Sequence, residues 1–156
     1  MYQIQETELQ RAPTVYIQTS VHGPETQGYA VILLLMEAFL KTPPQGNIIR
    51  VPYANPYGMN MKWGERTFGR FDPNTGDNWN RCHAKLTDLN GHAPINIKKF
   101  ISLNEGVSLH ALAPHFKKSM LQDLEQEMKK NVLYARKLNL QRQHLAVEAD
   151  IVLDLQ

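Results

Sequence analysis

The first part of the chain alternates between strand-like and helix-like runs of apolar residues. Residues 14–20 form a β-branched and aromatic run typical of a buried central strand, and residues 47–53 form a second such run. Between them, residues 27–41 are long and apolar enough to favour a mostly buried helix, which Pro43-Pro44 cannot continue. We expect these segments to form a β-helix-β unit with parallel strands joined by a right-handed crossover.

The remaining pattern is less regular. Residues 1–13 are polar and are expected to begin as an extended edge strand. The stretch 54–96 is rich in Asn, Gly, Pro and aromatic residues; a loop of that length in a compact domain is usually functional or disordered, and its aromatic content argues against disorder. An apolar stripe predicts a helix over residues 114–137, and residues 148–155 are expected to end in another buried strand.

Composition narrows the class of protein. A chain of 156 residues suits one domain with a sizeable core, and a net charge of +2 gives no electrostatic reason to expect nucleic acid or a membrane as partner. The apolar run 29–40 is too short to span a bilayer and contains Glu37. The single cysteine, Cys82, excludes an intrachain disulfide framework and fits a reducing compartment, so we expect a cytoplasmic protein.

The first candidate site follows the strand 14–20. His22 and Glu25 place an imidazole and a carboxylate at its carboxyl end, where open α/β sheets bind their ligands. Together they supply two-thirds of the His2Glu set of catalytic zinc, which leaves a fourth position open for water. They are therefore candidate metal ligands. The alternative is that His22 caps the next helix and Glu25 lies in its first turn, favoured by the helix dipole.

The long loop carries a second candidate motif. Residues 55–58 (Asn-Pro-Tyr-Gly) follow a strand, and Arg70, Asn80 and Arg81 come further along. Because arginine binds a carboxylate through a bidentate fork and asparagine adds a donor, these residues can form an anion cradle. Alternatively, the two arginines make ion pairs that hold the loop in shape. Four aromatic side chains could line a pocket or form a small core of the loop itself: Tyr57, Trp63, Phe68 and Trp79.

These motifs in this order resemble one known family. The chain carries, in order, Thr-Ser-x-His-Gly-x-Glu at 19–25, Asn-Pro-x-Gly, Arg followed by Asp-x-x-Asn-Arg, and Asp-Leu at 154–155. This series resembles the succinylglutamate desuccinylase/aspartoacylase family, within the zinc carboxypeptidase-like superfamily. The resemblance covers 14–81 and 148–156, with a helical insertion around 97–145. It implies a doubly wound, three-layer α/β/α fold with a mostly parallel sheet, of which residues 1–156 are a partial catalytic domain.

The resemblance also implies a chemistry and a cofactor. It implies one Zn²⁺ per chain, held first by His22 and Glu25, and hydrolysis of an amide bond in an N-acyl amino acid or short peptide. The substrate is a small molecule with a free carboxylate. Zinc lowers the pKa of its bound water to about 7 and polarises the scissile carbonyl.

The resemblance assigns the loop residues to the substrate. Asn80 and Arg81 would grip its carboxylate. Arg70 would polarise the scissile carbonyl and stabilise the oxyanion, with Arg66 as the alternative.

One position departs from the family pattern at the metal. The third zinc ligand, a histidine, is expected where Gln156 stands, and an amide oxygen is a poor zinc ligand. Either the site is degenerate, or the histidine was replaced, or another group such as His110 or His115 completes the set of ligands. Asp154 either orients an imidazole or caps a strand end.

Other departures concern the loop and the far end of the domain. The acid expected two residues before Asn80 is replaced by Asn78. The family's general base, a glutamate on a later strand, has no counterpart here, which implies an N-terminal fragment that is inactive alone. The alternatives to a hydrolase are a non-catalytic relative that binds a carboxylate ligand, and a plain α/β binding module.

Overall fold

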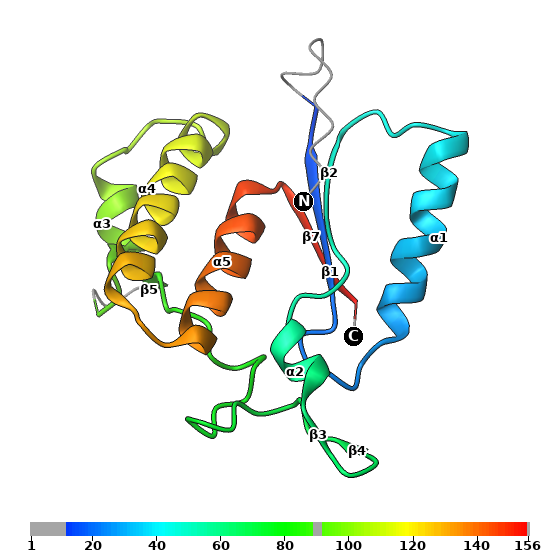
Figure 1. The fold of residues 1–156 in the computed structure, drawn as a ribbon. Helices are drawn as coiled ribbons and strands as arrows, with labels where there is room; N and C mark the ends of the chain where they lie inside the picture. The colour runs from blue at the N-terminus through cyan, green and yellow to red at the C-terminus, as the bar shows by residue number, and fades with distance from the viewer. Residues whose placement is uncertain (1–11, 89–91, 156) are drawn as a thin grey trace. The chain divides into compact units, whose positions relative to one another are not determined.

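The computed structural model describes residues 12–88 and 92–155. The chain divides into two compact units, one formed by residues up to 82 together with 149–155, and one formed by residues 83–148 (Figure 1). The predicted edge strand at 1–13 falls almost wholly outside the described residues, and Gln156 does too. Within the described ranges, no helix is both long and apolar enough to cross a bilayer.

The first unit is built on a parallel sheet of three strands. Strand β1 (Thr14–Thr19) lies between β2 (Asn47–Val51) and β7 (Ile151–Leu155), and both neighbours run parallel to it. Tyr16 and Ile17 on this central strand are buried. The predicted β-helix-β unit with a central first strand is confirmed, as is the α/β class with a parallel sheet.

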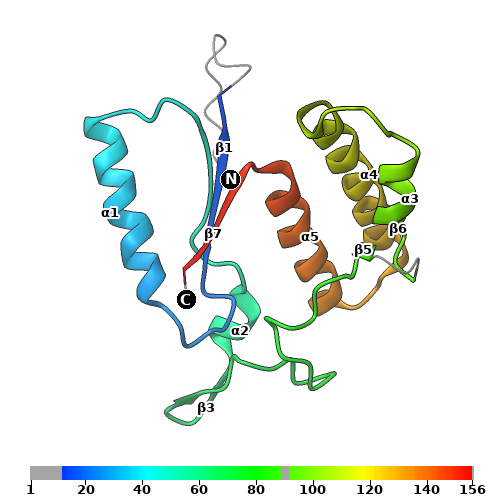
Figure 2. The ribbon, with the colours of Figure 1, turned by 180° about the vertical axis from the view of Figure 1, so that it is seen from behind.

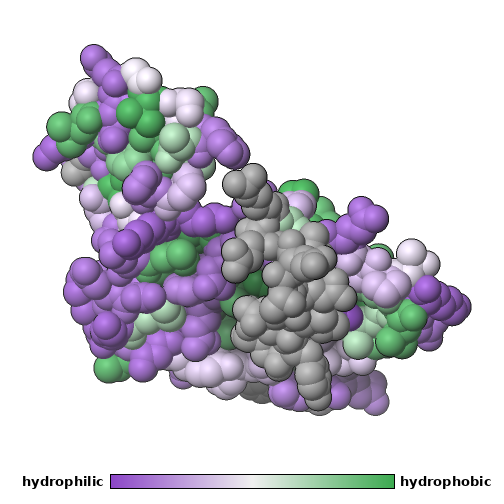
Figure 3. Space-filling model, turned by 90° about the horizontal axis from the view of Figure 1, so that it is seen from above, coloured by the Kyte–Doolittle hydropathy of each residue, from purple (hydrophilic) through white to green (hydrophobic). Residues whose placement is uncertain are grey.

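Helix α1 (Gln27–Lys41) connects β1 to β2, and its bounds are those that the apolar pattern predicts. The expected burial is wrong. Gly28 and Ile32 are its buried residues, whereas Leu34 is 65% exposed and Leu40 is 86% exposed. A lone helix against a three-stranded sheet buries one stripe, so its other apolar side chains face outward. Figure 2 shows α1 beside the sheet, and Figure 3 shows hydrophobic surface on the part of the unit that α1 forms.

Strand β7 corrects a second expectation. Residues 148–155 were expected to end in a buried strand, yet Ile151, Val152 and Leu153 are each more than 40% exposed. Strand β7 pairs with β1 on one side and is an edge strand among the described residues, so its side chains have neighbours on one side only. An apolar run indicates what a strand can bury, not what covers it.

The start of α1 packs closely on the carboxyl edge of the sheet. A Cβ atom on Gly28 would lie 2.6 Å from the Leu155 carbonyl oxygen and 2.8 Å from the Thr19 Cβ, so only glycine fits without a shift. The rings of Tyr29 and Tyr53 stack with centroids 4.7 Å apart. The hydrogen bond with Tyr29 raises the pKa of Tyr53.

Short elements follow β2 in the first unit. Helix α2 (Pro56–Asn60) leads into an antiparallel pair formed by β3 (Lys62–Trp63) and β4 (Arg66–Thr67). The second unit contains a parallel pair, β5 (Thr87–Asp88) with β6 (Ile95–Asn96), and then α3 (Ile97–Ser102), α4 (Leu109–Lys130) and α5 (Tyr134–Glu148).

The single helix predicted over 114–137 is wrong at both ends. Helix α4 begins at Leu109 because the Ser108 hydroxyl accepts a hydrogen bond from the Ala111 N–H, at 3.3 Å. It ends at Lys130, after which Asn131 is extended, and α5 begins as a separate helix at Tyr134. Local capping therefore sets the start of this helix five residues before Pro114, the first residue of the predicted helix.

Leu124 is the centre of the helical core in the second unit. It is fully buried and packs with Leu86 and Leu140. Replacing Leu124 with alanine leaves a cavity between α4 and α5, so we expect it to lower the free energy of unfolding by about 3 kcal/mol. Urea unfolding followed by far-ultraviolet circular dichroism measures this. Leu133→Ala is the control, because Leu133 is 54% exposed. A loss below about 1 kcal/mol for Leu124→Ala would contradict the packing described.

Candidate functional site

The turn that follows β1 positions the candidate metal ligands. Ser20 has a φ of 59°, in the left-handed region that side chains seldom adopt. Its buried hydroxyl lies 3.0 Å from the Thr19 hydroxyl and donates to the Glu25 carbonyl at 3.2 Å. Because both ends of the turn are tied in this way, His22 and Glu25 are held at the carboxyl end of the central strand. Strained backbone of this kind is often found at functional sites.

His22 and Glu25 converge. The His22 Nδ1 lies 2.9 Å from the Glu25 Oε2, and the imidazole is almost completely buried. The alternative that His22 caps the next helix is wrong, because Thr26 occupies the cap position of α1 and no acidic residue lies in its first turn.

Two loop residues complete the arrangement. Arg70 donates a guanidinium N–H to the Glu25 Oε1 at 2.7 Å, and the Asn78 Oδ1 lies 2.8 Å from the His22 Nε2. The structure thus brings His22, Glu25, Arg70 and Asn78 together from segments as far as 56 residues apart. The ion pair with Glu25 also gives Arg70 the loop-holding contact that was the alternative to substrate binding.

Hydrogen-bond roles at His22 follow from its neighbours. The Asn80 backbone N–H, which can only donate, lies 3.0 Å from the Asn78 Oδ1, so this atom is an acceptor and the His22 Nε2 must donate to it. The Nδ1 faces a carboxylate oxygen, which is also an acceptor. A neutral imidazole that donates from Nε2 turns the lone pair of Nδ1 toward the Glu25 carboxylate, so a cation held between these two atoms would be bound by both.

The donor atoms of this pair fit a zinc ion. Nitrogen and oxygen ligands bound at about 2.1 Å to one tetrahedral zinc lie about 3.4 Å apart, so the 2.9 Å between Nδ1 and Oε2 requires a small adjustment. Within residues 12–88 and 92–155, no third His, Cys, Asp or Glu joins them as a metal-binding group.

The other candidates near the metal stay untested. Gln156 lies outside the described residues. His110 and His115 lie on α4, in the second unit. Asp154 is exposed on β7, where it pairs in register with Gln18.

Three glycines hold the turn, α2 and the loop in contact. The Gly23 N–H donates to the Gly69 carbonyl at 2.9 Å, and a Cβ atom on Gly23 or on Gly69 would overlap the Gly58 carbonyl. Only glycine permits so close an approach of three backbones. Sequence reasoning missed this role, although Gly23 and Gly58 lie within two of the motifs that suggested the site and Gly69 directly precedes Arg70.

Asn55 gives the Asn-Pro-x-Gly motif a structural role. Its fully buried side chain donates to the Val21 carbonyl at 2.9 Å and accepts from the Gly58 N–H at 2.9 Å, which caps α2. The end of β2 is thereby joined to the residue that precedes His22. Sequence reasoning noted the motif without assigning this contact.

A narrow hairpin carries the remaining loop residues. The Trp79 N–H donates to the Arg70 carbonyl at 3.2 Å, and Phe71 forms a β-bridge with Asn78, so Arg70 and Asn78 lie on facing arms. The Asn80 backbone N–H and the His22 Nε2 both hydrogen-bond to the Asn78 Oδ1, which links Asn80 to His22. The Arg81 guanidinium is exposed and donates to the Asn80 carbonyl at 2.7 Å.

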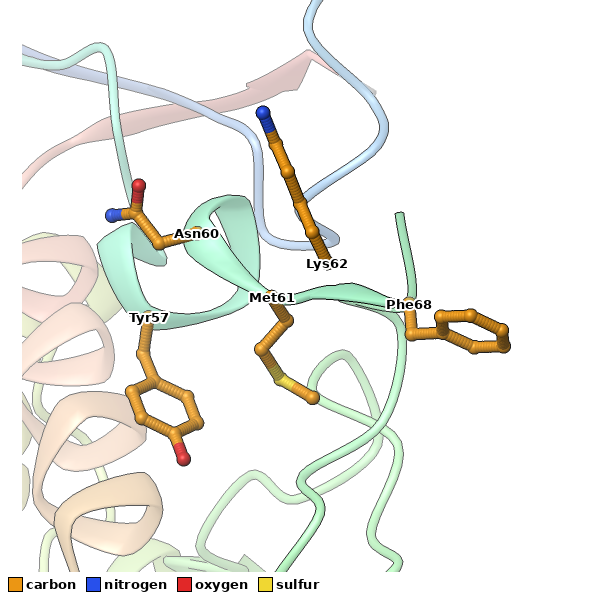
Figure 4. Close-up of a pocket in the computed structure, with 5 residues that line it drawn as sticks. All are labelled: Tyr57, Asn60, Met61, Lys62 and Phe68. Atoms are coloured by element: carbon orange, nitrogen blue, oxygen red, sulfur yellow. The ribbon is translucent and has the colours of Figure 1, made fainter. Parts of the chain in front are cut away.

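The aromatic residues divide between the two roles suggested for them. Trp79 is buried and contacts Tyr57 edge to face at 6.1 Å, as expected for a small loop core. Tyr57 and Phe68 are about half exposed and line an open groove of about 340 Å³ (Figure 4). The side chains of Trp63 and Arg66 lie outside the description, so the alternative role of Arg66 stays untested.

Comparison with known proteins identifies the family of this chain. The family model described as the succinylglutamate desuccinylase/aspartoacylase catalytic domain matches residues 11–155. No curated protein matches the chain.

Two crystal structures of Shewanella proteins named for this family are similar to the chain. The one from Shewanella frigidimarina NCIMB 400 is 36% identical, with a TM-score of 0.81 over 93% of this chain. The one from Shewanella amazonensis SB2B is 38% identical, with a TM-score of 0.80 over 92% of this chain. The chain spans 38% of the length of each. From its sequence and its fold, it belongs to the succinylglutamate desuccinylase/aspartoacylase family, a family of hydrolases.

Proposed function

We propose that this protein is a zinc-dependent hydrolase that cleaves an amide bond in an N-acyl amino acid or short peptide with a free carboxylate. The observation that carries the proposal is the convergence of the His22 Nδ1 and the Glu25 Oε2, which favours a cation between them. Family membership supports hydrolysis of a small molecule as the reaction class. The single cysteine supports a cytoplasmic location.

Each described residue has a distinct role in this proposal. His22 and Glu25 hold the ion, which when bound supplies an activated water and polarises the scissile carbonyl. Arg70 orients the Glu25 carboxylate with one N–H, and its side chain, 54% exposed, has further N–H donors for the oxygen that becomes negative. Asn80 and Arg81 bind the substrate carboxylate, for which the Arg81 guanidinium offers a fork of donors.

The proposal is tested by metal analysis and by hydrolysis of matched substrates. We expect about one zinc per chain in the purified protein. The full-length protein should hydrolyse N-acetyl amino acids, and it should discriminate against the same compounds with the carboxylate converted to a carboxamide. That change leaves the Arg81 donors without an anionic partner, so kcat/KM should fall about 100-fold. Absence of zinc, or equal rates on both substrates, would contradict the proposal.

A non-catalytic carboxylate-binding protein is the second candidate. The observation that favours it is that only two metal-binding side chains meet within the described ranges. It predicts that a simple carboxylate such as N-acetylaspartate binds with equal affinity before and after dialysis against a chelator. Zinc-dependent binding would instead favour the hydrolase.

A further inference from the structure

We propose that Asn78 is a positioning residue that aims the His22 imidazole at the metal and joins it to the carboxylate-binding residue Asn80. The inference rests on the proposed function, since it assumes that His22 is a metal ligand. It assigns a role to the position where the family's usual acid is absent.

One oxygen atom makes both connections. The Asn78 Oδ1 lies 2.8 Å from the His22 Nε2 and 3.0 Å from the Asn80 N–H. The His22 side chain is 5% exposed, so a solvent molecule has little room to replace the amide oxygen at Nε2. The amide thus holds the buried ring in one orientation, with Nδ1 facing Glu25.

The backbone of Asn78 is fixed independently of its side chain. Its carbonyl accepts from the Arg81 N–H at 2.8 Å and from the Cys82 thiol at 2.8 Å, and its strand position pairs with Phe71. A substitution at Asn78 that preserves side-chain shape therefore removes the oxygen contacts and leaves these backbone contacts in place.

The chemistry of the amide suits this role. Histidines that bind metals almost always donate their other ring N–H to a carboxylate or carbonyl oxygen, which fixes the ring and leaves the opposite nitrogen to the metal. Asn78 supplies such an oxygen without adding a negative charge. Because the same oxygen accepts from Asn80, a shift of the ring on metal binding would be transmitted to the backbone of Asn80.

The test compares two substitutions of similar shape. Asn78→Leu removes the acceptor, and Asn78→Asp keeps it and adds a charge. We expect zinc affinity, measured by competition with a chromophoric chelator, to fall 10- to 100-fold in Asn78→Leu and to be equal or tighter in Asn78→Asp. Asn74→Leu, on the same hairpin but bonded to Asp72 instead, is the control and should bind zinc like the wild type.

A second readout addresses the link to Asn80. In proton–nitrogen spectra we expect the Asn80 amide resonance to shift when zinc is added to wild type and to Asn78→Asp, but not to Asn78→Leu. A purely structural role for Asn78 would not distinguish these variants. If Asn78→Leu does not fold, Asn78→Asp still tests the proposed role of Asn78, because this variant must keep both the zinc affinity and the zinc-induced shift of the Asn80 amide resonance.

The outcomes separate this inference from the proposed function. Failure of wild type to bind zinc would overturn both. Zinc binding by wild type with equal affinity in Asn78→Leu, or an affinity reduced more than tenfold in folded Asn78→Asp, would overturn the role of Asn78 and leave the hydrolase proposal standing.

Discussion

Replacing His22 with alanine is expected to abolish stoichiometric zinc binding and, with it, hydrolysis. The substitution removes the Nδ1 donor and leaves Glu25 as the one described side chain at the ion, already paired with Arg70. At about 4 kcal/mol per ligand, loss of one donor corresponds to about a thousandfold weaker binding. Equilibrium dialysis followed by elemental analysis measures the zinc that remains.

Matched variants make this prediction specific. Glu25→Gln keeps the shape of the side chain and removes its charge, so it should weaken zinc binding in the same way. His144→Ala removes an imidazole that lies between Glu125 and Glu148 in the second unit, and it should keep the full zinc content. Retention of zinc by folded His22→Ala would contradict the assignment of the ligand pair.

The elements of the first unit were predictable because their signals are local. The apolar run before Ser20 and the proline pair after Thr42 mark the ends of β1 and α1 to within a residue or two of the structure. The burial of α1 and β7 was not predictable, because it depends on what lies beside each element and not on its own side chains. Helix α4 ends at its cap residue Asn131, although the apolar stripe continues to Leu133, so the stripe alone predicts an end that is too late.

The candidate site divides in the same way. The approach of His22 to Glu25 follows from a spacing of three residues across one turn, so the sequence predicts it. The contacts of Arg70 with Glu25 and of Asn78 with His22 join residues 45 and 56 positions apart, and only the folded hairpin and the glycine contact bring them together. Asn78 stands where the family has an acid, so the sequence suggested that the contact made by the acid was lost. The Asn78 Oδ1 nevertheless contacts the His22 Nε2, as a carboxylate oxygen could.

Arg70 carries the second large prediction, which concerns the chemical step. Replacing Arg70 with alanine removes donors from the oxygen that becomes negative in the transition state, so we expect kcat to fall about 100- to 1000-fold with a small change in KM. Stability should change little, because the ion pair with Glu25 is more than half exposed on the arginine side. Steady-state kinetics of the full-length protein on an N-acetyl amino acid measures the effect.

Arg81→Ala is the control that separates chemistry from binding. Its guanidinium is exposed and is assigned to the substrate carboxylate, so its loss should raise KM at least tenfold with a small change in kcat. Arg70 also contacts Glu25, so a moderate fall in zinc affinity is expected for Arg70→Ala, and rates must be compared at saturating zinc. If Arg70→Ala then raises KM and leaves kcat unchanged, Arg70 binds substrate and does not stabilise the oxyanion; the catalytic arginine must then be sought elsewhere, with Arg66 the first residue to test.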